Sequence, residues 1–122
     1  MKRDEKTIHL IDHILYADTF WKRLKGLLGT SHLPKDTGLL LRPCSQIHTW
    51  GMKYPIDVLY LDEIGRIVEI DRQVPPNRWK RKVPNAKMVL EISAGQIKGS
   101  RKMIGLKVDF LEEKREQNEK KG

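Results

Sequence analysis

The feature that most limits the possible folds is a hairpin pattern between residues 56 and 71. Two runs with aliphatic side chains, 56–61 and 66–71, flank the sequence Asp62-Glu63-Ile64-Gly65. A four-residue connection of this composition is typical of a turn between antiparallel strands. Further runs of strand length occur at residues 7–15, 38–41, 87–92 and 106–111, and residues 46–50 are a weaker candidate. We therefore predict a mainly β fold, a compact antiparallel β-barrel or sandwich.

One segment shows helical spacing instead. In residues 18–28, apolar side chains recur every three or four positions and basic side chains fill the opposite face. Asp18 is suited to cap the start of this helix, and Gly29 is suited to end it. The sequence therefore predicts one short amphipathic helix in an otherwise β chain.

The length of 122 residues fits a single domain, which we place at residues 1–111. Residues 112–122 contain four acidic and four basic side chains and no large apolar one. Such a composition cannot bury enough apolar surface to fold, so we expect a charged, disordered tail.

Cys44 is the only cysteine, so no disulfide can form within the chain. A domain of this size in an oxidising compartment is often stapled by disulfides, which favours a reducing compartment. The first residues are charged, and no apolar run reaches the length of a signal peptide or a transmembrane helix. We expect a cytoplasmic protein that does not span a membrane.

Positive charge is concentrated in one stretch of the chain. The net charge is +8, and residues 72–90 include six basic side chains and no acidic one. A tryptophan among such cations suits binding of a nucleic acid or another polyanion, with cations on phosphates and the indole on a base. A solvated loop that keeps the protein soluble, or a contact with an anionic membrane surface, would explain the same pattern. The candidate polyanion-binding residues are Arg72, Arg78, Trp79, Lys80, Arg81 and Lys82.

Asp57 is an oddly placed carboxylate. The four-residue turn predicts that Leu61 faces Arg66, Leu59 faces Val68 and Asp57 faces Ile70. Asp57 would then lie at the end of a largely apolar face, where an unpaired charge costs several kcal/mol. It must accept hydrogen bonds, pair with a cation such as Arg42 or Lys53, or meet a ligand at the mouth of a pocket. The first two alternatives are structural, and the third would make Asp57 part of a site.

Residues 47–62, IHTWGMKYPIDVLYLD, resemble the signature of the family known as domain of unknown function 192. Three further blocks agree in order, namely RLKGL at residues 23–27, GLLL at 38–41 and VLEISAG at 89–95. The resemblance extends over approximately residues 7–110. It implies a compact β-barrel-like sandwich and no settled activity.

Met52, Pro55 and Asp57 carry over from the common pattern of this family. Two departures are visible, since Gly51 separates Trp50 from Met52 and the pattern's Asn-Thr pair before the proline is missing. The resemblance therefore implies roles for the matching positions only.

The sequence offers little support for catalysis or for a metal. Cys44 and His48 are four residues apart, about 13 Å along an extended strand, so their contact would need an intervening turn. A hydrolase using Asp57 or Cys44 with His48 is the weakest alternative, because no nucleophile elbow, phosphate loop or metal motif is present. No paired ligand spacing links His9, His13, His32, Cys44 and His48, so we predict no metal and no cofactor.

Aromatic, thioether and carboxylate side chains gather between residues 48 and 57. We therefore favour a binding module, not an enzyme, that holds a small ligand or a protein segment at a rim. The candidate ligand-binding residues of this rim site are His48, Trp50, Met52 and Asp57. Polyanion binding by the basic segment is the main alternative.

Overall fold

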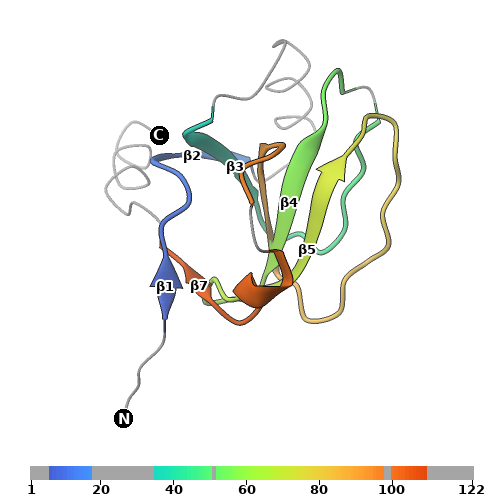
Figure 1. The fold of residues 1–122 in the computed structure, drawn as a ribbon. Helices are drawn as coiled ribbons and strands as arrows, with labels where there is room; N and C mark the ends of the chain where they lie inside the picture. The colour runs from blue at the N-terminus through green and yellow to red at the C-terminus, as the bar shows by residue number, and fades with distance from the viewer. Residues whose placement is uncertain (1–5, 18–34, 51, 98–99, 110–122) are drawn as a thin grey trace, which may run out of the picture.

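The computed structural model describes residues 6–17, 35–50, 52–97 and 100–109. The described elements are β1 (Thr7–Ile8), β2 (His13–Ala17), β3 (Thr37–Leu41), β4 (Ile56–Leu61), β5 (Ile67–Val74), β6 (Met88–Ser93), the 3₁₀ helix η1 (Ser100–Met103) and β7 (Lys107–Val108). Five of the strands form one sheet in the order β2-β3-β6-β4-β5, and β1 pairs with β7 in a second, two-stranded sheet (Figure 1). The predicted mainly β, sandwich-like fold is confirmed.

The strand directions differ from a purely antiparallel arrangement. The pairs β3–β6, β6–β4 and β4–β5 are antiparallel, but β2–β3 and β1–β7 are parallel. The larger sheet has β2 and β5 at its edges and does not close into a barrel. A parallel pair needs a long crossover connection, and residues 18–36 separate β2 from β3. The predicted helix at residues 18–28 lies in this connection, outside the described residues, as does the predicted tail at 112–122.

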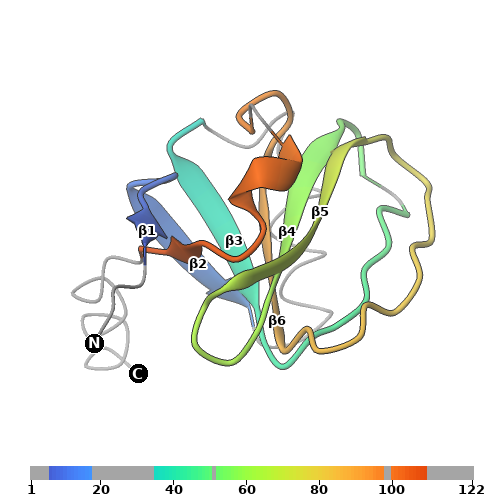
Figure 2. The same cartoon turned by 60° about the horizontal axis from the view of Figure 1, so that its bottom comes forward.

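Apolar side chains cover both faces of the central strands. Every residue of β3 and β4 is buried, which explains why these strands read as continuous apolar runs in the sequence. One face packs against residues from 44–54 and 83–86, and the other against β1, η1 and β7. Figure 2 shows the first group of segments on one side of the sheet and the second group on the other.

The predicted hairpin is confirmed, and its turn chemistry is visible. Asp62 Oδ1 accepts hydrogen bonds from the backbone N–H groups of Ile64 and Arg66, at 3.0 and 2.9 Å. Gly65 has a φ of 93°, a left-handed conformation that glycine adopts without steric cost. The tip of the hairpin therefore follows from local sequence.

The predicted register of this hairpin is wrong. Leu59 pairs with Ile70 and Leu61 with Ile67, because the ladder shifts between Tyr60 and Leu61 and again near Asp57. Such bulges insert an extra residue into one strand and move the partners that follow. Val68 consequently packs on the face opposite to Leu59. Asp57 stays on the Leu59 face as predicted, because β4 pairs with β6 without a register shift from Ile56 to Leu61.

Other predictions met mixed outcomes. The segment 7–15 forms parts of two strands that pair with β7 and β3 rather than with each other. The run 87–92 corresponds to β6 and is confirmed. Residues 46–50 contribute one isolated bridge, between His48 and Trp79, instead of a strand. The 3₁₀ helix η1 was not predicted, because four residues carry no usable periodicity.

Candidate functional site

Two irregular segments, residues 44–50 and 75–87, run side by side against one face of the sheet (Figures 1 and 2). We call them the paired loops. Their antiparallel alignment is held by backbone hydrogen bonds from Cys44 N to Lys87 O (3.0 Å), Val83 N to Ser45 O (2.8 Å), Lys80 N to Ile47 O (3.1 Å), Thr49 N to Arg78 O (2.8 Å) and Asn77 N to Thr49 O (2.9 Å). These bonds satisfy backbone groups that no regular sheet pairs, so the two loops form one unit.

Thr49 locks one end of the paired loops. Its side chain is fully buried, and its hydroxyl donates to the carbonyl of Pro75 at 2.6 Å and accepts from the N–H of Arg78 at 2.9 Å. Nothing in the local sequence singles out this residue, because one threonine between a histidine and a tryptophan carries no recognisable pattern. Thr49 fixes where the residues on either side of it, His48 and Trp50, are presented.

Aromatic side chains lie at this end of the paired loops. The ring of His48 stacks on the indole of Trp79, with centroids 4.6 Å apart and planes tilted by 34°. The N–H of Trp50 donates to His48 Nδ1 at 3.3 Å, which leaves that nitrogen as an acceptor. The side chains of Trp50 and Trp79 are 62% and 69% exposed, unusually high for tryptophan.

Basic side chains surround these rings. The paired loops contain five cations and no acidic residue. Lys80 is partly buried and its Nζ lies 3.8 Å from Asp71 Oδ2, so part of its charge is balanced. Arg72 lies on β5 rather than on the loops. The remaining cations, Arg78, Arg81, Lys82 and Lys87, are exposed.

The predicted rim site is divided by the structure. His48 and Trp50 belong to the paired loops, but Met52 is 5% exposed and packs in the core with Tyr54 and Val74. Asp57 has no exposed surface. Alternate residues of an extended strand face opposite sides, and both sides of β4 are covered, so Asp57 cannot share a surface with Trp50.

Asp57 is surrounded by backbone donors. Its Oδ1 accepts from the N–H of Gln73 at 2.7 Å, and its Oδ2 accepts from the N–H groups of Gly95 and Ile97 at 3.0 and 3.3 Å. Gln73 has a φ of 52°, an uncommon left-handed conformation for this residue type, which the carboxylate bond helps to hold. Asp57 thus ties β4 to the end of β5 and to the loop after β6, the structural alternative among those that the sequence left open.

The hydrolase residues do not form a catalytic arrangement. The thiol of Cys44 donates to the carbonyl of Gln46 at 3.1 Å, whereas the ring of His48 stacks on Trp79. Within the described residues, no group of three or more His, Cys, Asp and Glu side chains is placed to hold a metal ion. The same part of the chain contains no helix that is long and apolar enough to cross a membrane.

A profile of the family DUF192, described as "Uncharacterized ACR", matches residues 2–110. The chain belongs to the DUF192 family. This confirms the resemblance seen in residues 47–62. A UPF0127 protein of Thermococcus sibiricus is 34% identical over 110 residues, covering 81% of this chain and 67% of the relative. A UPF0127 protein of Thermococcus gammatolerans is 33% identical over 92 residues, covering 70% of this chain and 58% of the relative.

A solved structure shows a similar fold. The crystal structure of a protein of unknown function from Novosphingobium aromaticivorans superposes with a TM-score of 0.58 at 20% identity. The match covers 67% of this chain and 63% of that one. At this identity the likeness shows a common fold and nothing about a ligand.

In this DUF192 chain, the core beneath the paired loops holds a buried tyrosine. Tyr60 has no exposed surface, and its hydroxyl donates to Asp71 Oδ2 at 2.9 Å. Lys80 pairs with the same oxygen, so Asp71 connects Tyr60 on the sheet to the second of the paired loops. Burial raises the pKa of Tyr60 above its ordinary value of 10.0, and the negative charge of Asp71 raises it further.

A test follows from the raised pKa of Tyr60. The unfolded chain releases the phenolic proton near pH 10, whereas the folded chain keeps it, so this group's contribution to the free energy of unfolding is complete below about pH 10 and falls as the pH rises further. Urea unfolding of the wild type and of Tyr60→Phe at increasing pH measures this contribution. We expect a steeper alkaline loss in the wild type. Parallel curves for the two proteins would contradict the assignment.

Proposed function

We propose that this DUF192 protein is a non-enzymatic binding module whose paired loops bind single-stranded nucleic acid. The observation that carries the proposal is the pair of exposed indoles, Trp50 and Trp79, on loops with five cations and no acidic residue. Non-specific single-strand binders combine the same two elements, aromatic rings that stack on bases and cations that follow the phosphates.

The indoles supply the stacking part of the proposal. Tryptophan buries a large apolar area when it contacts a partner, so two exposed indoles on the paired loops favour a ligand with flat apolar faces. The contact with His48 and the bonds of Thr49 hold the loop that carries Trp79. A ring that is already oriented loses less conformational entropy when a base stacks on it.

The cations supply the electrostatic part. Exposed Arg78, Arg81 and Lys82 lie beside Trp79 in the chain, within reach of the phosphates that flank a stacked base. Neutralising phosphates releases counterions, which drives binding and makes it sensitive to salt. The cytoplasmic location that the single cysteine favours would give such a surface access to RNA.

A single strand suits this surface better than a duplex. Reading a duplex in the major groove usually takes a helix or a two-stranded ribbon that can enter the groove, whereas the paired loops lie against one face of the sheet (Figures 1 and 2). In a single strand the bases are unpaired and their faces are open to indole rings. An anionic membrane offers charge but no flat bases, so it is the competing ligand that an experiment should include.

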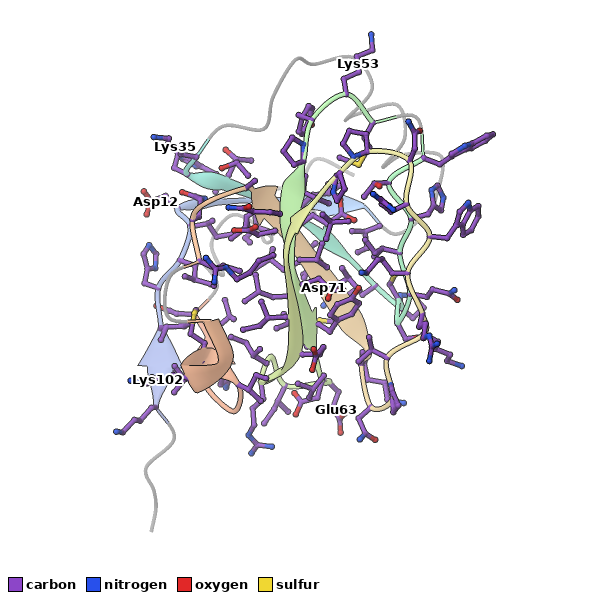
Figure 3. All side chains as sticks on the ribbon, turned by 45° about the vertical axis from the view of Figure 1, so that its right-hand side comes forward. Asp12, Lys35, Lys53, Glu63, Asp71 and Lys102 are labelled. Atoms are coloured by element: carbon purple, nitrogen blue, oxygen red, sulfur yellow. The ribbon has the colours of Figure 1, made fainter. Side chains whose placement is uncertain are left out.

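The test is fluorescence anisotropy of a labelled oligouridylate between about 50 and about 200 mM KCl. We expect affinity to fall linearly on a double-logarithmic plot, and the double variant Arg81→Ala/Lys82→Ala to make the slope shallower by about 1.4, since each phosphate contact in a single strand contributes about 0.7. The matched control is Lys35→Ala/Lys102→Ala, which removes the same charge. Figure 3 shows Lys35 and Lys102 on the side of the molecule away from the paired loops.

Two results would refute the proposal. One is the absence of oligouridylate binding at low salt, together with binding to anionic phosphatidylserine vesicles. The other is an equal change of slope in the loop variant and the control variant, because a general charge effect would then replace a site.

A further inference from the structure

A pocket of about 590 Å³ lies where the paired loops meet at the end remote from Thr49. The hydrogen bonds from Cys44 N to Lys87 O and from Val83 N to Ser45 O join its two walls. Asn85 lies in the turn that the Ala86 N–H to Val83 carbonyl bond (3.2 Å) closes within the second loop, and it has a φ of 71°. The lining residues are Pro43, Cys44, Ser45, Gln46, Lys82, Val83, Pro84, Asn85, Ala86 and Lys87.

The chemistry of this lining favours an anion. Two lysines, Lys82 and Lys87, are among the lining residues, and no lining residue is acidic. Ser45 and Asn85, which also line the pocket, carry side chains that can act as neutral donors. Ammonium groups bind phosphate as point charges, and charge-assisted hydrogen bonds are stronger than neutral ones.

The size of the pocket narrows the class of anion. Ligand pockets for small molecules usually enclose about 300 to 1,000 Å³, so a volume of 590 Å³ holds more than one phosphate group. Val83 and Ala86 contribute apolar wall beside the cations, which suits the sugar or base attached to a phosphate. A terminal phosphomonoester carries close to two negative charges at neutral pH, against one for an internal diester, and so matches two lysines.

We infer that this pocket binds a phosphomonoester. The group has two sources with the same chemistry, the phosphorylated end of a nucleic-acid strand lying on the paired loops, or a free mononucleotide. The first source rests on the proposed function and would make the protein prefer phosphorylated ends. The second is independent of the proposed function.

Cys44 makes the pocket testable, because it is the chain's only cysteine and lies in the wall. Iodoacetamide alkylates a thiolate, forming an S–C bond as iodide leaves and the thiol proton passes to solvent. The rate can be followed by mass spectrometry of the intact protein. We expect adenosine monophosphate to slow this alkylation at least about fivefold, and adenosine, which lacks the phosphate, to leave it unchanged.

The pocket variant is Lys87→Ala, which keeps the backbone bonds of this residue to Cys44 and Leu61. We expect it to weaken protection by the nucleotide about tenfold or more, as loss of a hydrogen bond to a charged group does. Lys35→Ala is the matched control and should behave as the wild type. A thermal melt that matches the wild type shows that the variant is folded. Equal alkylation rates with and without adenosine monophosphate would overturn the inference.

A second measurement separates the two sources and the two proposals. Anisotropy is compared for oligouridylates with a 5′-phosphate, a 3′-phosphate or hydroxyl groups at both ends. Tighter binding of one phosphorylated oligomer, lost in Lys87→Ala, assigns the pocket to a strand end. If the three oligouridylates bind equally and adenosine monophosphate protects Cys44 from alkylation, the pocket binds the free mononucleotide. Nucleotide protection without any oligouridylate binding would refute the proposed function and leave the pocket standing.

Discussion

Replacing both Trp50 and Trp79 with alanine is expected to weaken oligouridylate binding by about 100-fold or more. Stacking of one base on an aromatic side chain is worth about 1 to 3 kcal/mol, and about 1.4 kcal/mol is a factor of ten in affinity. The side chains are 62% and 69% exposed, so truncating them removes little packing. The free energy of unfolding should change by less than about 0.5 kcal/mol for Trp50→Ala, and fall by about 1 kcal/mol for Trp79→Ala, which also loses the contact with His48. Anisotropy and urea unfolding of the same protein samples check both parts.

Two control variants make this result specific. Trp50→Phe/Trp79→Phe keeps a ring at each position and should retain most of the affinity. Ile64→Ala removes an exposed apolar side chain (43% exposed) at the tip of the β4–β5 hairpin and should leave the affinity unchanged. If the double alanine variant binds as tightly as the wild type, the indoles do not stack on bases and the proposed function is wrong.

The variant Asp57→Asn is expected to lower the free energy of unfolding by about 3 kcal/mol. Asparagine has nearly the same shape, but it replaces one carboxylate oxygen by an NH₂ group. All three partners of Asp57 are backbone N–H donors, so at least one donor would face another donor without an acceptor. The charge that strengthens the remaining bonds is lost as well.

Urea denaturation with a matched control measures this effect. Glu63→Gln removes the same charge at the exposed hairpin turn, visible at the lower edge of Figure 3, and should change stability by less than about 0.5 kcal/mol. If Asp57→Asn unfolded at the same urea concentration as the wild type, the structural role of Asp57 would be contradicted. If the folded variant lost oligouridylate affinity without losing stability, Asp57 would belong to the site after all.

The hydrogen bonds of Asp57 also affect the candidate site indirectly. Its bond to Gln73 holds the left-handed residue just before β5 ends at Val74, where the chain leaves the sheet to form the second paired loop. Partial opening at this point would loosen the loop that carries Trp79. A modest fall in affinity that tracks the fall in stability is therefore consistent with positioning, whereas a direct contact with the ligand would weaken binding without any loss of stability.

Part of the candidate site was predictable from residue type alone. Clustered cations around Trp79 and the aromatic Trp50 near His48 are visible in the sequence, and both lie on the exposed surface. Their meeting was not predictable, because His48 and Trp79 are 31 positions apart (79 − 48) and join through an isolated bridge. Met52 and Asp57, close to His48 in sequence, are buried elsewhere.

The sequence alone determined the local features, namely where most strands lie, the tip of the β4–β5 hairpin and the face of β4 that bears Asp57. These depend on side-chain alternation and on turn residues that act over a few positions. Only the tertiary structure decided the parallel pairing of β2 with β3, the bulged register of β4 with β5, the backbone donors around Asp57 and the assembly of two distant loops into one surface. Such features depend on how both faces of a sheet are covered and on backbone groups that every residue possesses, so they cannot be predicted from residue type.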